Sequence, residues 1–152
     1  MTKINGSNAQ WLDESTLPPL ITAAEQLAVD EALLNEAEFG SLTTPIVRTW
    51  QAAVPAVVLG SSSQLRQEVN HEICAKLDIP VLRRPSGGAT VILGPGCVMW
   101  SVITPFKDKP SLDAIHASML EPLAAELSKA GQPVVREGTS DLVVSTAEGV
   151  KK

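Results

Sequence analysis

The spacing of apolar positions predicts two helices in the first half of the chain. A Thr22-Ala-Ala-Glu25 capping box, apolar residues at helical spacing and a stop at Gly40 predict the first helix over about 22–39. After the serines at 61–63, an apolar residue at every fourth position predicts a second helix over about 64–77.

A third helix is predicted from near Ser111 toward Gly131, because its apolar residues fall on one side of a helix. Pro122 lies inside this segment and lacks the N–H group that a helix interior uses. We therefore expect a kink or a break at this proline.

Short runs rich in β-branched residues, bounded by proline and glycine, predict the strands. These runs are 46–50, 56–59, 79–84, 90–93, 97–103 and 141–144, followed by a returning strand that begins at 150. The fourth and fifth runs flank Gly94-Pro-Gly96, a connection suited to a hairpin, so these two strands are expected to pair antiparallel.

The alternation of strands and helices is interrupted by hairpins. This order favours a mixed, largely antiparallel sheet with helices packed against it over a doubly wound parallel sheet. The predicted fold class is α+β. The polar residues 1–20 are expected to form a flexible N-terminal arm, and residues 21–152 to belong to one domain.

Composition narrows the possible partners. The 152 residues are 44% hydrophobic and 19% charged, an ordinary mixture for one globular core. A net charge of -5 argues against a general nucleic-acid-binding surface, so any anionic ligand must be held locally. The apolar runs are far shorter than the ~20 residues of a membrane span, and the N-terminus has no signal-peptide pattern. We expect a cytoplasmic protein with no membrane partner.

The segment Arg83-Arg84-Pro85-Ser86-Gly87-Gly88-Ala89-Thr90-Val91 is the strongest candidate for a binding site. Its two glycines allow positive φ angles and bring backbone N–H groups close to an anion, and the arginines add donors for phosphate or carboxylate. The alternative is a surface turn with two solvated arginines. The position between two apolar strands favours a binding loop, although neither a P-loop nor a dinucleotide fingerprint is present.

The segment from Arg83 to Ile92 resembles the central motif of the lipoate-protein ligases, which are grouped with biotin-protein ligases and octanoyltransferases. That motif has two arginines, one variable residue, Ser-Gly-Gly-Gly, a small residue and an apolar pair. The further matches, in the family's order, are 27–33, 57–60 with Gln64, and 141–144, followed by Glu148-Gly149 and then Lys152 in place of the family's essential lysine. The resemblance covers the N-terminal part of the family's catalytic domain.

This resemblance implies an ATP-dependent acyl ligase that uses Mg²⁺. A lipoate or octanoate carboxylate would attack the α-phosphate of ATP, and the acyl group would then pass to a lysine of a lipoyl carrier domain. Such carriers belong to 2-oxoacid dehydrogenase complexes or are the glycine cleavage H protein. The resemblance makes Lys152 the catalytic residue and places Arg83 and Lys152 against the acyl group. The residues that it implies for ATP or acyl-adenylate binding are Arg84, Ser86, Gly87, Gly88, Ala89, Thr90, Val91, Ile92, Asp141 and Lys152.

Three departures from the ligase pattern keep alternatives open. Ala89 replaces the third glycine of the motif, Leu93 replaces a histidine, and Ser140 replaces an asparagine. One alternative is an octanoyl or lipoyl transferase that uses a cysteine thioester without ATP. The other is a non-catalytic truncated fragment that binds an acyl ligand or a partner. For the ligase too, we expect the 152-residue chain by itself to be inactive in ligation through truncation. We expect no metal site from cysteine spacing, and both Cys74 and Cys97 are expected in the core.

Overall fold

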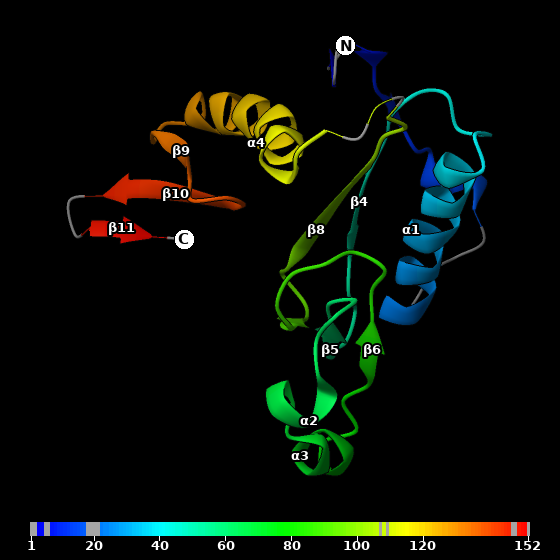
Figure 1. The fold of residues 1–152 in the computed structure, drawn as a ribbon. Helices are drawn as coiled ribbons and strands as arrows, with labels where there is room; N and C mark the ends of the chain where they lie inside the picture. Colours follow the sequence, from blue (N-terminus) through cyan, green and yellow to red (C-terminus); the bar gives the residue numbers. More distant parts are fainter. Residues whose placement is uncertain are drawn as a thin grey trace. The chain divides into compact units, whose positions relative to one another are not determined.

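The computed structural model describes residues 3–4, 7–17, 22–106, 108, 110–146 and 149–151. These residues form two compact units. The 10–105 unit runs from Gln10 to Pro105, and the second unit comprises the described residues before Gln10 and after Pro105. Figure 1 labels helices and strands of both units.

The 10–105 unit contains two small sheets. Its strands are β3 (Gln10–Trp11), β4 (Ile46–Gln51), β5 (Ala56–Leu59), β6 (Val81–Arg83), β7 (Val91–Leu93) and β8 (Val98–Ile103). One sheet has the order β3-β4-β8 and the other β6-β5-β7. The β3–β4 and β5–β6 pairs are parallel, whereas β4–β8 and β5–β7 are antiparallel. The predicted strands of this region and the α+β class are confirmed.

The helix α1 (Ala23–Glu38) forms as its capping box predicts. The Glu25 N–H donates to the Thr22 hydroxyl oxygen at 3.2 Å, and the Thr22 N–H donates to a Glu25 carboxylate oxygen at 2.8 Å. Gly40 follows with a φ of 78°, a left-handed conformation that ends helices at low cost for glycine. This helix is fixed by local chemistry at both ends.

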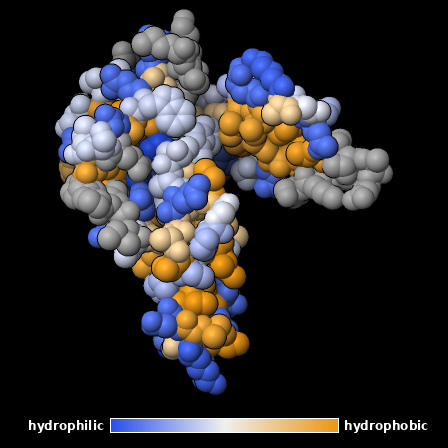
Figure 2. Space-filling model, turned by 180° about the vertical axis from the view of Figure 1, so that it is seen from behind, coloured by the Kyte–Doolittle hydropathy of each residue, from blue (hydrophilic) through white to orange (hydrophobic). Residues whose placement is uncertain are grey.

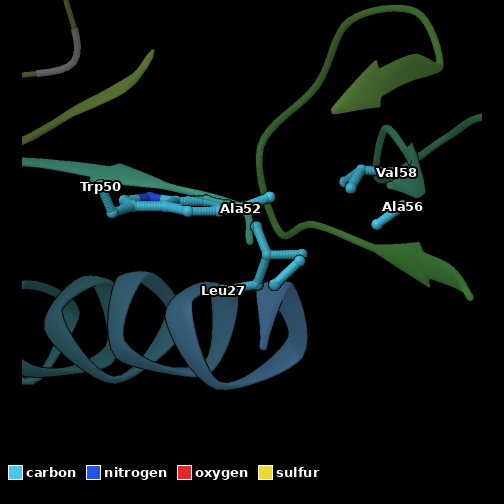
Figure 3. Packing of buried hydrophobic residues seen from close by; sticks show 6 residues of the cluster. Leu27, Trp50, Ala52, Ala56 and Val58 are labelled. Atoms are coloured by element: carbon cyan, nitrogen blue, oxygen red, sulfur yellow. The ribbon is translucent and has the colours of Figure 1, made fainter. Parts of the chain in front are cut away.

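The core of this unit lies between α1 and the strands. Leu27 of α1 packs with Trp50, Ala52, Ala56 and Val58 in one buried cluster. Figure 3 shows Leu27 pointing from the helix toward Ala52 and the ring of Trp50. Full burial of an aromatic or branched aliphatic side chain contributes about 1.5–3 kcal/mol to folding. The cluster therefore holds α1 against the strands.

The prediction of one continuous helix over about 64–77 is wrong. In place of one helix over 64–77, the structure has two short helices, α2 (Leu65–Glu68) and α3 (His71–Lys76). A separate 3-10 turn lies much earlier in the chain, at Glu14–Thr16. Val69 is extended, with a φ of -133°, and the Asn70 side chain accepts the Ile73 N–H at 3.1 Å to start α3 again. The cap at Asn70 thus competes with helix continuation.

The break leaves apolar side chains of the predicted stripe in solvent. Ile73 is 51% exposed and Leu77 is 64% exposed. Figure 2 shows apolar surface at the lower end of the molecule, where Figure 1 places α2 and α3. The four-residue spacing therefore did not mark a buried helical face.

The predicted hairpin between β7 and β8 is also wrong. Each strand pairs with a different neighbour, because β7 joins β5 and β8 joins β4. Gly94-Pro-Gly96 instead carries the chain from one sheet to the other. It still forms a tight turn, in which the Cys97 N–H donates to the Gly94 carbonyl at 3.0 Å and Gly96 has a φ of 89°.

The second unit contains one helix and two groups of strands. Its elements are β1 (Lys3–Ile4), β2 (Ser7–Asn8), α4 (Leu112–Ser128), β9 (Val134–Glu137), β10 (Asp141–Thr146) and β11 (Gly149–Lys151). β10 pairs antiparallel with both β9 and β11. The returning strand is thus confirmed as far as Lys151, whereas β9 and the short strands of the first eleven residues were not predicted.

The helix α4 continues through Pro122, so the alternative of a break at this position is wrong. A proline costs its helix one hydrogen bond. The helix nevertheless packs along β9. Arg136 of β9 donates to the Asp113 carboxylate at 2.8 Å, which lowers the pKa of Asp113 through hydrogen bonding and then through charge attraction. Ser128 also accepts the Val134 N–H at 2.9 Å.

Candidate functional site

The loop 84–90 connects β6 to β7 and crosses the carboxyl end of β5, which lies between them. Gly60, the first residue after β5, touches this loop. A Cβ atom at Gly60 would lie 2.0 Å from the carbonyl oxygen of Gly88. The Ser61 N–H donates to the Ser86 carbonyl at 2.9 Å. The loop is therefore seated directly on the backbone that leaves the central strand.

The two glycines of the loop have different conformations. Gly88 has a φ of 94°, a conformation in which other residues are strained, but Gly87 does not have a positive φ. A Cβ atom at Gly87 would meet nothing within 4 Å. The expectation of positive φ at both glycines is thus wrong for Gly87 and confirmed for Gly88.

The Arg84 guanidinium lies inside the turn of the loop. Its Nη2 donates to the carbonyls of Gly87 at 2.8 Å and Ala89 at 2.9 Å, and its Nη1 donates to the Val58 carbonyl at 3.2 Å. Partial burial lowers the pKa of Arg84, although a guanidinium stays charged. The side chain expected to bind phosphate therefore also holds the loop in shape.

Arg83 makes an equivalent set of bonds on the neighbouring turn. Its Nη1 donates to the carbonyls of Gly60 at 2.6 Å, Ser63 at 2.9 Å and Ser61 at 3.2 Å. The two adjacent arginines thus fix two backbone segments, 60–63 and 87–89. The acyl and phosphate roles of the arginines stay predictions.

Glu68 of α2 binds the far end of the loop and was missed by sequence reasoning. One carboxylate oxygen accepts the Thr90 hydroxyl at 2.6 Å and the Thr90 N–H at 3.2 Å, while the other accepts the Gln64 N–H at 3.0 Å. These bonds, the Thr90 hydroxyl first, lower the pKa of Glu68 from 4.5 to about 2. The carboxylate is therefore charged at neutral pH.

The lowered pKa of Glu68 predicts an acid-sensitive contact. Because the folded chain binds this proton more weakly than the unfolded chain does, the contact is fully present above pH 4.5 and is lost as the pH falls toward about 2. A carbon-13 NMR titration of the Glu68 carboxyl should give a midpoint well below 4.5. Thr90→Val should move that midpoint upward, whereas an ordinary midpoint in the unaltered chain would contradict the contact.

A cavity of about 270 Å³ lies beside the loop within the 10–105 unit. Its apolar wall comes from α1 and the strands, through Leu27, Trp50, Val58, Val91, Leu93 and Met99. Polar groups enter from Arg84 and Ser86 of the loop and from Asp30 and Ser101. Apolar lining with a few convergent polar groups is typical of small-molecule sites.

The polar wall of the cavity is fixed by a buried charge pair. Arg48 of β4 is fully buried and donates to the Asp30 carboxylate at 2.8 Å and to the Gln26 carbonyl at 2.9 Å, and it also bonds the Gln26 side chain. The Ser101 hydroxyl donates to the other Asp30 oxygen at 2.8 Å. This network joins α1, β4 and β8 behind the cavity.

Trp50 contributes a buried donor to the same wall. The residue is 5% exposed, and its Nε1 has no hydrogen-bond partner within the described part of the chain. An unpaired buried N–H costs about 1–3 kcal/mol.

The remaining predicted residues fall into three groups. Val91 lines the cavity, whereas Ile92 is 75% exposed on β7. Asp141 begins β10 in the second unit, and Lys152 lies outside the described residues. The roles of Asp141 and Lys152 therefore stay predictions.

The cysteines differ from each other. Cys74 is buried, as expected, but Cys97 is exposed, so its placement in the core is wrong. Cys97 lies in the turn before β8 and not within that apolar strand.

Among the residues that the structure describes, no cluster of three or more His, Cys, Asp or Glu side chains could hold a metal ion. No helix in the described ranges is long and apolar enough to cross a membrane.

The α+β fold agrees with the comparison to known proteins. Residues 22–151 match the Lipoyl protein ligase A/B catalytic domain. The chain belongs to this family, and the resemblance inferred from its motifs is confirmed.

The chain is also similar to individual curated proteins and to solved structures. It is 38% identical over 71 residues to an octanoyltransferase LipM of Carboxydothermus hydrogenoformans, covering 47% of this chain and 26% of the relative. It is 32% identical over 111 residues to octanoyltransferase LipM of Moorella thermoacetica, and this match covers 71% of this chain and 40% of that relative. A bi-partite lipoate protein ligase from Thermoplasma acidophilum shares the fold, with a TM-score of 0.65 and 22% identity over 77% of this chain and 46% of that chain. The chain thus spans less than half the length of these relatives.

Proposed function

We propose that this chain binds a medium-length acyl group, octanoyl or lipoyl, for transfer to a lysine of a lipoyl carrier domain. The observation that carries the proposal is the apolar cavity beside the loop 84–90. Burying about six methylene groups at about 0.8 kcal/mol each would give about 5 kcal/mol, less the cost of association. A largely hydrocarbon chain fits this lining better than a polar substrate does.

Acyl transfer without ATP is the first form of the proposal. The curated relatives above are named octanoyltransferases, which supports it. Arg84 supports it as well, because contact with a phosphate would compete with its bonds to the carbonyls of Val58, Gly87 and Ala89. In this reaction an acyl thioester loses its thiol and the carrier lysine gains an amide bond.

ATP-dependent ligation through an acyl-adenylate is the second form. The match of Arg83–Ile92 to the ligase motif supports this form. Ala89, which replaces the third glycine of that motif, argues against it. In this form the backbone of 87–92 and Asp141 would contact the adenylate, and Mg²⁺ would accompany the triphosphate. The described residues offer no group of three or more His, Cys, Asp or Glu side chains that could hold this ion.

Lys152 has the same proposed role in both forms. Its ammonium would neutralise the negative charge that develops on the acyl carbonyl oxygen, a contribution of about 10²–10³ in rate for one well-placed donor. Neither described cysteine lines the cavity, so neither Cys74 nor Cys97 is the proposed nucleophile of a thioester. The proposed carriers are the lipoyl domains of 2-oxoacid dehydrogenase complexes or the glycine cleavage H protein.

The test combines binding and transfer. Calorimetry of the chain with octanoate and with lipoate should show saturable binding. A lipoyl carrier domain should then gain the mass of an octanoyl group from an octanoyl-loaded carrier thioester without ATP. Pyrophosphate release that depends on lipoate and ATP would favour the ligase form instead. Binding without transfer would favour a non-catalytic acyl-binding chain, and absence of binding would overturn the proposal.

A further inference from the structure

The wall of the cavity is held from two sides by groups of opposite charge. On the inner side, Arg84 lines the cavity and takes the carbonyls of Gly87 and Ala89. Beyond the loop, Glu68 takes the N–H and the hydroxyl of the next residue, Thr90. Charge-assisted hydrogen bonds of this kind are about twice as strong as neutral ones. The loop is thus clamped between a guanidinium and a carboxylate.

The outer contact lies next to a residue that forms the cavity. Thr90 immediately precedes Val91, which lines the cavity from the first position of β7. Glu68 itself does not line the cavity and lies on α2 at the surface. Its second oxygen holds the Gln64 N–H at the start of α2. A shift of α2 would therefore be transmitted through Glu68 to the cavity wall at Val91.

We propose that Glu68 is a positioning residue for the acyl site, which fixes the loop 84–90 and the start of β7 by binding Thr90 from outside the cavity. This inference rests on the proposed function, because it assigns the cavity to the acyl group. It adds a residue that makes no contact with the ligand. Preorganisation of this kind raises affinity by lowering the ordering cost of binding.

A double-mutant cycle tests the contact directly. Glu68→Ala removes the carboxylate, Thr90→Val removes the hydroxyl that it binds and keeps the backbone N–H, and the double variant carries both changes. Each single variant should raise the Kd for octanoate about 3- to 10-fold, the range expected for one lost hydrogen bond. The double variant should be no weaker than the more affected single variant, because both changes remove the same contact. Glu72→Ala on the neighbouring α3 is the matched control for loss of an exposed carboxylate.

Hydrogen exchange separates positioning from general stability. The amides of residues 84–91 should exchange faster in both single variants, while those of α1 and β4 keep their rates. A merely structural role would lower the thermal midpoint and leave the Kd for octanoate unchanged, which overturns the proposal. Additive effects in the cycle would overturn it too. Failure of the unaltered chain to bind octanoate would instead overturn the proposed function, and with it the role of Glu68 in acyl binding.

Discussion

Arg48→Met should destabilise the 10–105 unit by about 3–5 kcal/mol, the cost of breaking a buried ion pair from one side. Arg48 is fully buried, and its side chain carries bonds to Asp30 and to Gln26. Methionine fills a similar volume but leaves the Asp30 carboxylate, 17% exposed, without its cation. Urea denaturation followed by circular dichroism measures the loss. Arg66→Met on the exposed surface of α2 is the matched control and should change stability by less than about 0.5 kcal/mol.

A second substitution shows whether the stability is lost through the broken Arg48–Asp30 ion pair or through altered packing. If the uncompensated carboxylate is the cause, Arg48→Met combined with Asp30→Leu should recover much of the lost stability, because both charges are then gone. A loss below about 1 kcal/mol in Arg48→Met alone would contradict the role assigned to the network. No recovery in the double variant would indicate that packing or the Ser101 bond to Asp30 carries the effect.

Local chemistry explains the elements that the sequence predicted well. The first helix is delimited by Thr22, Glu25 and Gly40, and all three act within four residues of a helix end. The strand at 56–59 is a short apolar run, and the structure buries all four of its residues at the centre of a sheet. Such signals need no knowledge of distant partners, so composition and spacing are sufficient.

Pairing partners explain most of the errors. Gly94-Pro-Gly96 would suit a turn in either topology, but β7 pairs with β5, whose Val57 and Val58 lie opposite Ile92 and Val91. The same applies to the second predicted helix, since its four-residue spacing does not reveal that Asn70 caps a new helix. For the predicted hairpin, pairing with a distant strand overrides the local turn pattern. For the predicted helix, the side-chain cap at Asn70 overrides the four-residue spacing.

The candidate site was predicted in its location and not in its internal bonds. The Gly-Gly loop after two arginines was visible in the sequence, and so was Gly60 as a boundary of β5. The carbonyl partners of Arg83 and Arg84 were not visible, because they come from 58–63 and from the loop itself. Nothing in the local sequence pointed from Glu68 to a partner 22 residues away.

Gly60→Ala should abolish octanoate binding and lower stability by about 1–3 kcal/mol, the usual range for overpacking. The new methyl group would lie 2.0 Å from the Gly88 carbonyl oxygen and 3.0 Å from its carbonyl carbon, both backbone atoms. A flexible side chain could rotate away, but this backbone is held by Arg84 at both neighbouring carbonyls. The loop must therefore move as a unit, and Arg84 and Ser86 move with it away from the cavity.

The matched control is Gly94→Ala, because its added Cβ would make only an ordinary contact, 3.9 Å from the Pro55 Cα, and its φ is not positive. Calorimetry with octanoate and thermal denaturation should leave this control near the unaltered chain. Gly60→Ala should lose binding even at temperatures where circular dichroism shows it folded, because the displaced loop no longer shapes the wall. Normal affinity in a folded Gly60→Ala chain would mean that the acyl group does not depend on the loop, and the cavity would lose its assigned role.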